Sequence, residues 1–158
     1  MSDIILRQRA TVAEHIRAEN VKEWPAVYET FVQNDSAYYD VAPFATRYKG
    51  IDGVKNFYET ITAVLPDFEI TVTAEYDTPG CSIREVTISG THKGEYFGIP
   101  PTGRRVQIEL AGFFLFGTGE NAGKLVAERV YFDNEILLRQ MRGETDAPTR
   151  IGLAELAQ

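Results

Sequence analysis

Two late segments of the chain carry polar residues that are suited to acid–base chemistry. These residues are Gln107, Glu109, Arg129, Tyr131 and Asp133. A carboxylate whose pKa is raised by an apolar pocket can remove and return a proton near neutral pH, and a neighbouring donor can stabilise a developing oxyanion. The same residues can equally form a surface network of cross-strand charge pairs. The choice between these interpretations depends on where the two segments lie in the fold.

The two segments are predicted to form a β-hairpin around the glycine-rich turn 117–123. If the turn centres on Glu120, Asp133 lies opposite Gln107 and Tyr131 lies opposite Glu109, so the polar residues share one face. We expect this face to line a concave pocket. The expected catalytic residues are Asp133, His92 and Gln107, and the expected substrate contacts on this face are Tyr131, Arg129 and Glu109.

The opposite face of this hairpin is a nearly continuous apolar surface on which Glu128 is the single polar residue. Its apolar members are Val106, Ile108, Leu110, Phe114, Phe116, Val126, Val130 and Phe132. The first face also carries apolar residues, Phe113 and Leu115, and a sheet that is apolar on both faces must be covered on both. Helices can cover one face, and we expect a second subunit to cover the other in a homodimer.

The two histidines each have a structural and a functional interpretation. His92 can be held by a backbone carbonyl near a turn, or it can act as a donor at the pocket. His15 precedes Glu19 by four residues on a predicted helix, so the two can form a helix-surface ion pair. Alternatively, this helix closes the pocket and His15 points inward as a substrate contact. Two histidines and one cysteine, widely separated, predict no metal site of ordinary spacing, and we expect no cofactor.

Aromatic residues are numerous, with nine Phe, eight Tyr and one Trp. Most are expected in the core, and those of the helical part of the chain are expected to line a pocket for a small, flat, hydrophobic ligand. These substrate contacts are Trp24, Tyr28, Phe31, Tyr39 and Phe57.

The hydrophobic spacing indicates which elements position these residues. Helical spacing runs over residues 4–33, with Pro25 opening a second helix, and returns over 54–65 after Asp52 as a plausible N-cap. Alternating strands are predicted at 38–41, 68–76, 81–92, 105–116 and 124–133, followed by a helix at 135–141 and a polar tail at 143–158. Helices followed by meandering strands predict the α+β class in one domain over residues 1–158.

Length and charge exclude several classes of protein. The chain has 158 residues, a usual length for one domain, and its net charge of −7 argues against a nucleic-acid partner. The longest apolar run, 110–116, is too short to cross a membrane, and the N-terminus has no signal-peptide pattern. The lone Cys81 excludes an intrachain disulfide, so we expect a cytoplasmic protein.

Two motifs and a strand end carry a family resemblance. The motifs are Gly90-Thr91-His92-Lys93-Gly94 and Gly98-Ile99-Pro100-Pro101-Thr102-Gly103-Arg104, and the strand ends at Asp133. Over about residues 10–141 the chain resembles the SnoaL-like polyketide cyclases of the NTF2-like superfamily. The resemblance implies a cone in which a curved, mostly antiparallel sheet wraps around three helices.

The resemblance also implies a chemistry. Asp133 would be the general acid/base of a cofactor-independent intramolecular aldol closure of a polyketide ester, or of an isomerisation. A histidine assists this aspartate in the family, and here Gln107, or Glu109 one pair along, stands across the expected sheet. A non-catalytic module that binds a small hydrophobic ligand is the alternative. An epoxide-hydrolase-like enzyme using Glu109, Arg129 and Asp133 is a further one, and whether the protein is an enzyme stays open.

Overall fold

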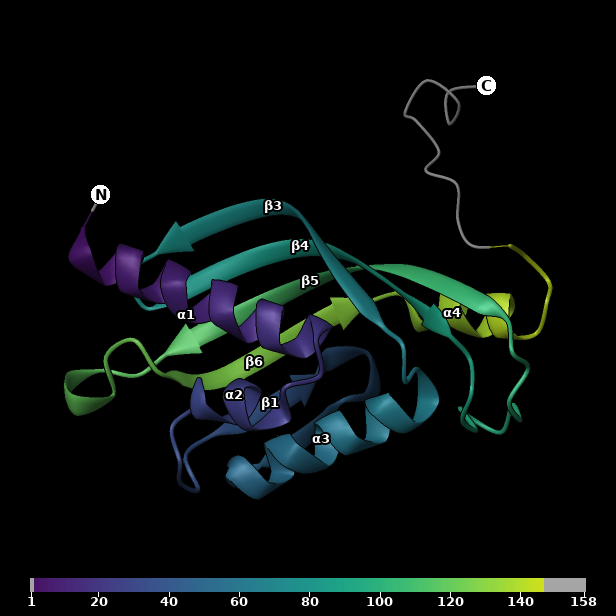
Figure 1. Cartoon of the computed structure of the whole chain (residues 1–158), viewed down its shortest axis with the longest axis horizontal. Coiled ribbons are helices and arrows are strands. Elements are labelled where there is room, and N and C mark those ends of the chain that lie inside the picture. Colours follow the sequence, from purple (N-terminus) through teal and green to yellow (C-terminus); the bar gives the residue numbers. More distant parts are fainter. Residues whose placement is uncertain (1, 147–158) are drawn as a thin grey trace.

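One curved six-stranded sheet organises the chain in the computed structural model, which describes residues 2–146 (Figure 1). The elements are α1 (Asp3–Asn20), α2 (Trp24–Glu29), β1 (Tyr38–Val41), β2 (Thr46–Lys49), α3 (Gly50–Val64), β3 (Glu69–Thr78), β4 (Cys81–Thr91), β5 (Arg105–Phe116), β6 (Leu125–Phe132) and α4 (Asn134–Met141), with short 3-10 turns at Ala42–Phe44 and Gly119–Asn121. The strand order is β2-β1-β6-β5-β4-β3, and all neighbours are antiparallel except β1 and β6. The expected α+β class is confirmed.

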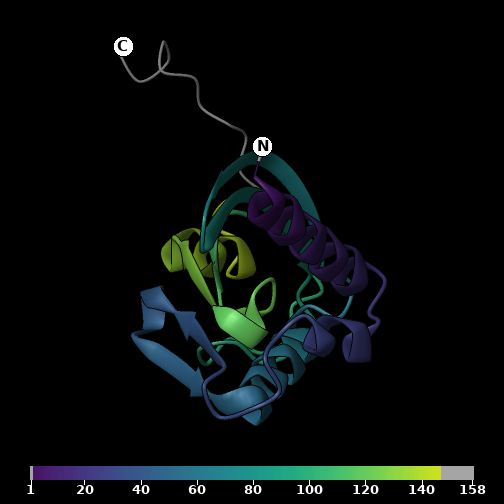
Figure 2. The same cartoon turned by 90° about the vertical axis from the view of Figure 1, so that its left-hand side faces the viewer.

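The helices close the open side of the curved sheet (Figure 2). α1 packs on β3 and β4, α3 packs beside β1 and β2, and α4 covers the start of β5. Val12 and Ile16 of α1 and Val54 and Tyr58 of α3 are buried in the main core cluster, so the apolar stripe of each helix faces the sheet.

Two helix boundaries differ from the prediction, and backbone hydrogen bonds explain both. α2 ends at Glu29 because Val32 donates to the carbonyl of Leu125 and so continues toward β6 rather than into another helical turn. α3 begins at Gly50 instead of after Asp52, because the backbone carbonyls of two residues outside the helix accept its first two N–H groups. The polar edge strand β2 was not predicted because its residues show no apolar alternation.

The register of the β5–β6 hairpin differs by two residues from the prediction. Tyr131 pairs with Ala111 instead of Glu109, and β6 ends at Phe132, which pairs with Leu110. The 3-10 turn at Gly119–Asn121 and the irregularity at Leu115/Phe116 move the centre of the hairpin to Asn121. Asp133 therefore lies beyond the last strand pair and does not face Gln107. The side-chain alternation itself is preserved because the shift is an even number.

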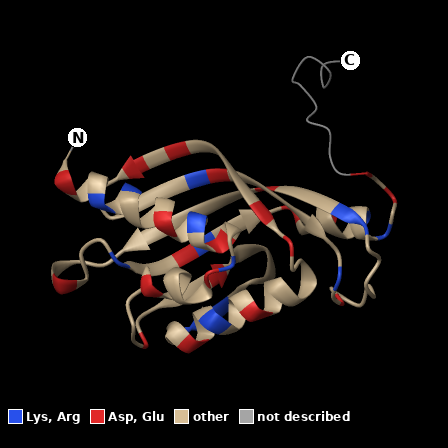
Figure 3. Ribbon diagram, viewed as in Figure 1, with Lys and Arg blue, Asp and Glu red and all other residues tan. Residues whose placement is uncertain are grey.

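Charged residues are distributed over the helices and strands, with both signs interspersed along most elements (Figure 3). Within residues 2–146, no helix combines the length and apolar character that crossing a membrane requires.

Candidate functional site

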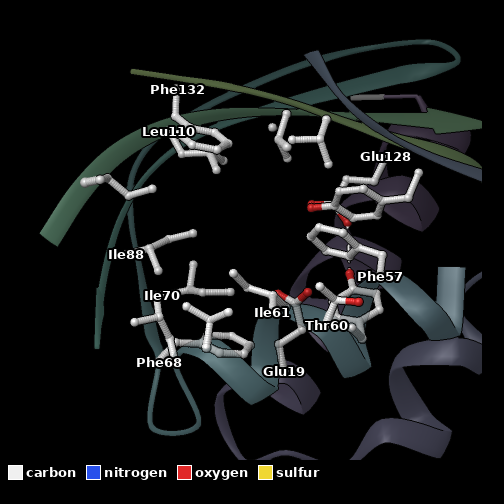
Figure 4. Close-up of a pocket in the computed structure, with 18 of the residues that line it drawn as sticks. Glu19, Phe57, Thr60, Ile61, Phe68, Ile70, Ile88, Leu110, Glu128 and Phe132 are labelled. Atoms are coloured by element: carbon white, nitrogen blue, oxygen red, sulfur yellow. Dashed lines mark hydrogen bonds between the residues drawn. The ribbon is translucent and has the colours of Figure 1, made fainter. Parts of the chain in front are cut away.

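A cavity of about 530 Å³ lies between the curved sheet and the helices. One wall is apolar and comes from alternate residues of β3 to β6, including Ile70, Ile88, Leu110 and Phe132 (Figure 4). The alternation of strand side chains places these residues on one face, where the helices exclude water. This volume lies within the range of roughly 300–1,000 Å³ found for small-molecule sites.

The mostly apolar lining also contains charged residues, which are Arg84 and three glutamates, Glu19, Glu95 and Glu128. Of the three glutamates, Glu19 and Glu128 are buried. Glu19 comes from the last turn of α1 and Glu128 from β6, and both carboxyl groups belong to the cavity wall. His15 Nε2 lies 3.2 Å from Glu19 Oε1 and 3.2 Å from Glu128 Oε2, although His15 itself is fully buried behind the wall. The polar end of the cavity is therefore a Glu–His–Glu cluster.

Two tyrosines complete the polar end. The Tyr58 hydroxyl donates to Glu128 Oε2 at 3.1 Å and lies 3.0 Å from His15 Nε2. Tyr39 of β1 also lines the cavity, and its ring stacks on Phe57 with the centroids 3.6 Å apart. Burial, followed by the nearby negative charge of Glu128, raises the pKa of both tyrosines, so their hydroxyls stay protonated and can donate.

Thr30 fixes the protonation of the other His15 nitrogen. His15 Nδ1 lies 2.8 Å from Thr30 Oγ1, and that hydroxyl donates its proton to the carbonyl of Val27 at 2.6 Å. A hydroxyl has one proton to give, so Thr30 must accept from His15 and Nδ1 must carry hydrogen. Proton exchange at His15 is therefore confined to Nε2.

Two members of the cluster, His15 and Glu128, hold their protons more tightly than isolated groups do. Burial acts to lower the pKa of His15, but the attraction of Glu19 and the hydrogen bonds to both glutamates raise it to about 10. Burial also raises the pKa of Glu128, against the opposing hydrogen bond from His15. The raised pKa brings the Glu128 carboxyl closer to the range in which a group can exchange protons near neutral pH.

The same three side chains are the group of residues in the described part of the chain that could hold a metal ion. One donor atom from each of His15, Glu19 and Glu128 lies within 4.8 Å of the others. The sequence prediction of no metal site considered the spacing of histidine and cysteine alone and did not foresee this cluster, whose members come from α1 and β6.

Asp133 and Gln107 lie outside the cavity lining. Asp133 is exposed and caps α4, accepting from the backbone N–H groups of Glu135 at 2.9 Å and Ile136 at 3.4 Å. The main chain of Gln107 exchanges two hydrogen bonds with the side chain of Gln140. The expected position of Asp133 in the pocket is wrong, because β6 presents Glu128, Val130 and Phe132 to the cavity and ends before Asp133.

The remaining polar residues of the predicted face also lie away from the cavity. Arg129 and Tyr131 border a second hollow of about 300 Å³ together with Asp40, whose Oδ2 lies 3.4 Å from Arg129 Nε. Glu109 is exposed on β5, between two residues that line the cavity. The more apolar face of the hairpin faces inward, because burying it against the helices removes apolar surface from water. The face that carries Arg129, Tyr131 and Glu109 points outward.

His92 is fully buried and its Nδ1 lies 2.9 Å from Thr102 Oγ1, within the connection between β4 and β5. It lies outside the cavity lining, and its partner is a threonine hydroxyl instead of the backbone carbonyl expected in the structural interpretation. His15 is buried as well, so its predicted pairing with Glu19 exists but is not a surface ion pair.

The five predicted aromatic contacts divide into two groups. Tyr39 and Phe57 line the cavity, whereas Trp24, Tyr28 and Phe31 pack outside the lining. Phe31 is fully buried and contacts the edge of the His15 ring at 5.6 Å between centroids.

Sequence reasoning missed Glu19 and Glu128 as members of the site. The available signal was Glu128 itself, the single polar residue on an apolar strand face, since a buried carboxylate needs a partner or a proton. In the sequence, Glu19 stands out only as a helical partner for His15.

Comparisons with known proteins place this geometry in a family. The family model described as SnoaL-like polyketide cyclase matches residues 10–141. No curated protein matches the chain significantly.

Solved structures share the fold at low sequence identity. A Jannaschia protein provisionally described as a SnoaL-like polyketide cyclase is 18% identical, with a TM-score of 0.78 and coverage of 94% of this chain and 98% of that one. AclR from Streptomyces galilaeus, provisionally described as a hydroxylase, is 21% identical (TM-score 0.73, coverage 92% and 87%). IdmH from Streptomyces antibioticus, provisionally described as a polyketide cyclase, is 21% identical (TM-score 0.71, coverage 85% and 98%). The cavity, the curved sheet and the matched family model lead to one conclusion: the chain belongs to the SnoaL-like polyketide cyclase family.

Proposed function

We propose that the protein transfers protons on a small hydrophobic carbonyl compound, as a cyclase or isomerase of the intramolecular aldol type that needs no cofactor. The observation that carries this proposal is the pair of buried carboxylates, Glu19 and Glu128, at one end of a mostly apolar cavity. Removing a proton next to a carbonyl requires a base shielded from water and a donor for the oxygen that becomes negative. The family name supports the same reaction class.

Each group has a role in this proposal. Glu128 acts as the base, because burial raises the pKa of its carboxyl. The apolar wall of Ile88, Leu110 and Phe132 binds the hydrocarbon part of the substrate, and the stacked Tyr39 and Phe57 rings favour a flat compound. This assignment moves the acid/base from Asp133, which caps a helix, to the carboxylate inside the cavity.

The test uses β-tetralone, a flat apolar ketone, as the probe. Wild-type protein should accelerate exchange of its α-protons with deuterium oxide, followed by proton NMR. Glu128→Gln keeps the shape of the side chain but cannot accept the proton, so the rate should fall by roughly 10²–10⁴-fold, the usual contribution of a general acid–base group.

Two control variants sharpen the test. Glu85→Gln changes an exposed glutamate of β4 outside the cavity lining and should leave exchange unchanged. Asp133→Asn should also leave it unchanged. Exchange that survives Glu128→Gln but is lost in Asp133→Asn would return the role to Asp133, and binding of β-tetralone without any exchange would favour a non-catalytic binding module.

A further inference from the structure

We propose that His15 is a proton relay between Glu19 and Glu128, so that one carboxylate works as the acid while the other works as the base. This inference rests on the proposed function and adds a second carboxylate and a reset step to it. Glu19 and Glu128 line the cavity, and His15 lies behind them and does not. The histidine therefore cannot act on a ligand directly, but it contacts both groups that can.

The position of Nε2 suits transfer in either direction. It lies 3.2 Å from one oxygen of each carboxyl group, so neither partner is favoured by distance. The bond from Nδ1 to Thr30 holds the other side of the ring and leaves Nε2 as the exchanging position.

The surroundings of the ring favour transfer through the imidazole over transfer through water. The rings of Phe31 and Phe114 meet it edge-on at centroid distances of 5.6 and 5.5 Å. The titratable groups that face the cluster are Glu19 from α1, Tyr58 from α3, Tyr39 from β1 and Glu128 from β6. Both tyrosines keep their protons, which leaves the two glutamates as the exchanging partners.

The proton balance closes without a further reactant. In an aldol closure, Glu128 takes the proton from the carbon next to the carbonyl as the new carbon–carbon bond forms. His15 gives its Nε2 proton to Glu19, which passes it to the carbonyl oxygen that becomes a hydroxyl. The product has the composition of the substrate, and Glu128 now holds a proton in place of the one that His15 has lost. His15 takes that proton from Glu128, which restores the starting state.

The experiment is nitrogen NMR of the full chain labelled in its histidines, which are two in number and are assigned with His92→Gln. In the wild type, both ring nitrogens of His15 should be protonated at neutral pH. Glu19→Gln and Glu128→Gln should each lower the titration midpoint of His15 by about one pH unit or more, and the control Glu85→Gln should not. These shifts would show that Nε2 is shared by both carboxylates, and the kinetic measurement below separates a relay from a purely structural contact.

Three results would overturn the relay. The first is a wild-type His15 whose Nε2 is unprotonated at neutral pH, a result that needs no variant to fold. The second is a midpoint that moves in only one of the two glutamine variants. A shift of the His15 signals on adding stoichiometric zinc chloride would likewise assign the cluster to a cation and overturn the relay.

A kinetic measurement separates this inference from the proposed function. Glu19→Gln should slow β-tetralone exchange at least tenfold with unchanged β-tetralone affinity, because the partner carboxylate can no longer hold a transferable proton. Absence of exchange in the wild type defeats the proposed function. Exchange in the wild type that Glu19→Gln leaves intact defeats the relay alone.

Discussion

Two carboxylates in an apolar cavity are stable only when protons or donors satisfy them, since an unpaired buried charge is costly. Here His15 and Tyr58 are the hydrogen-bond donors to Glu128, and His15 also pairs with Glu19. The side chains that stabilise the fold at this point are therefore the ones that give the cavity its acid–base capacity. Substitutions in the cluster should change stability and proton transfer together.

The pH dependence of stability follows from His15. Its pKa rises from about 6.5 in the unfolded chain to about 10 in the folded protein. The folded state therefore binds the proton more tightly, and this contribution to stability is fully present below about pH 6.5 and is lost as the pH rises through about 10.

We expect the free energy of unfolding of the wild type, measured by urea titration, to decline across this window. His15→Gln should flatten the decline, and Glu85→Gln should preserve it. An equally steep decline in His15→Gln would show that another group controls the pH dependence.

At the scale of elements, the residues that carry the family resemblance have mainly structural roles. A Cβ at Gly94 would overlap the backbone carbonyl of Ala63 at the end of α3, and one at Gly90 would press on Leu65 and the backbone of Phe68. These glycines allow the connection after β4 to pass close to the end of α3. Asp133, the third part of the resemblance, begins α4.

Gly94→Ala should consequently destabilise the protein strongly, because the backbone of Ala63 cannot move aside as a flexible side chain could. Gly112→Ala is the matched control, since a Cβ there meets the Phe114 ring at an ordinary 3.5 Å. Thermal unfolding should show a much larger loss for Gly94→Ala, and equal losses would contradict the close-approach explanation.

Asp133→Ala should cost about 1 kcal/mol of unfolding free energy, the usual value of an N-cap, because two backbone N–H groups of α4 lose their acceptor. Asp133→Ser should retain most of that stability, because serine caps helices as well. β-Tetralone exchange should be unchanged in both variants, and its loss in the stable Asp133→Ser would restore a chemical role to Asp133.

At the scale of the whole molecule, the outer face of the sheet carries partly exposed apolar residues. Phe113 and Tyr131 meet there at 5.6 Å between ring centroids, and 46% of Tyr131 is exposed. The homodimer expected from the sequence remains a prediction, and this face is where we place it.

Light scattering at micromolar concentration should give twice the mass of one chain, and Phe113→Lys should give the mass of one chain with its fold intact. A stable interface between two subunits buries at least about 1,200 Å² in total, and the lysine of Phe113→Lys would place a charge within that buried area. A wild-type monomer would exclude the dimer.

The sequence was sufficient for the architecture but not for the site, and the hairpin shows why. Alternation of apolar and polar residues predicted which residues of β5 and β6 share a face, and the structure agrees. Alternation cannot tell which face the helices will cover, so the polar set around Asp133 was placed inside. The true cluster joins α1 to β6, and helical spacing alone could suggest only the His15–Glu19 half of it.

The separation of the cluster along the chain decides when it can form. Tyr58 lies 43 residues after His15 and 70 residues before Glu128, so three distant parts of the polypeptide must meet. Contacts of such long range form slowly, and α1 leaves the ribosome well before β6 exists. During synthesis, His15 and Glu19 of α1 therefore remain exposed to water until β6 has been made. Acid–base competence appears only as one of the last events of folding, when β6 joins the sheet and carries Glu128 to them.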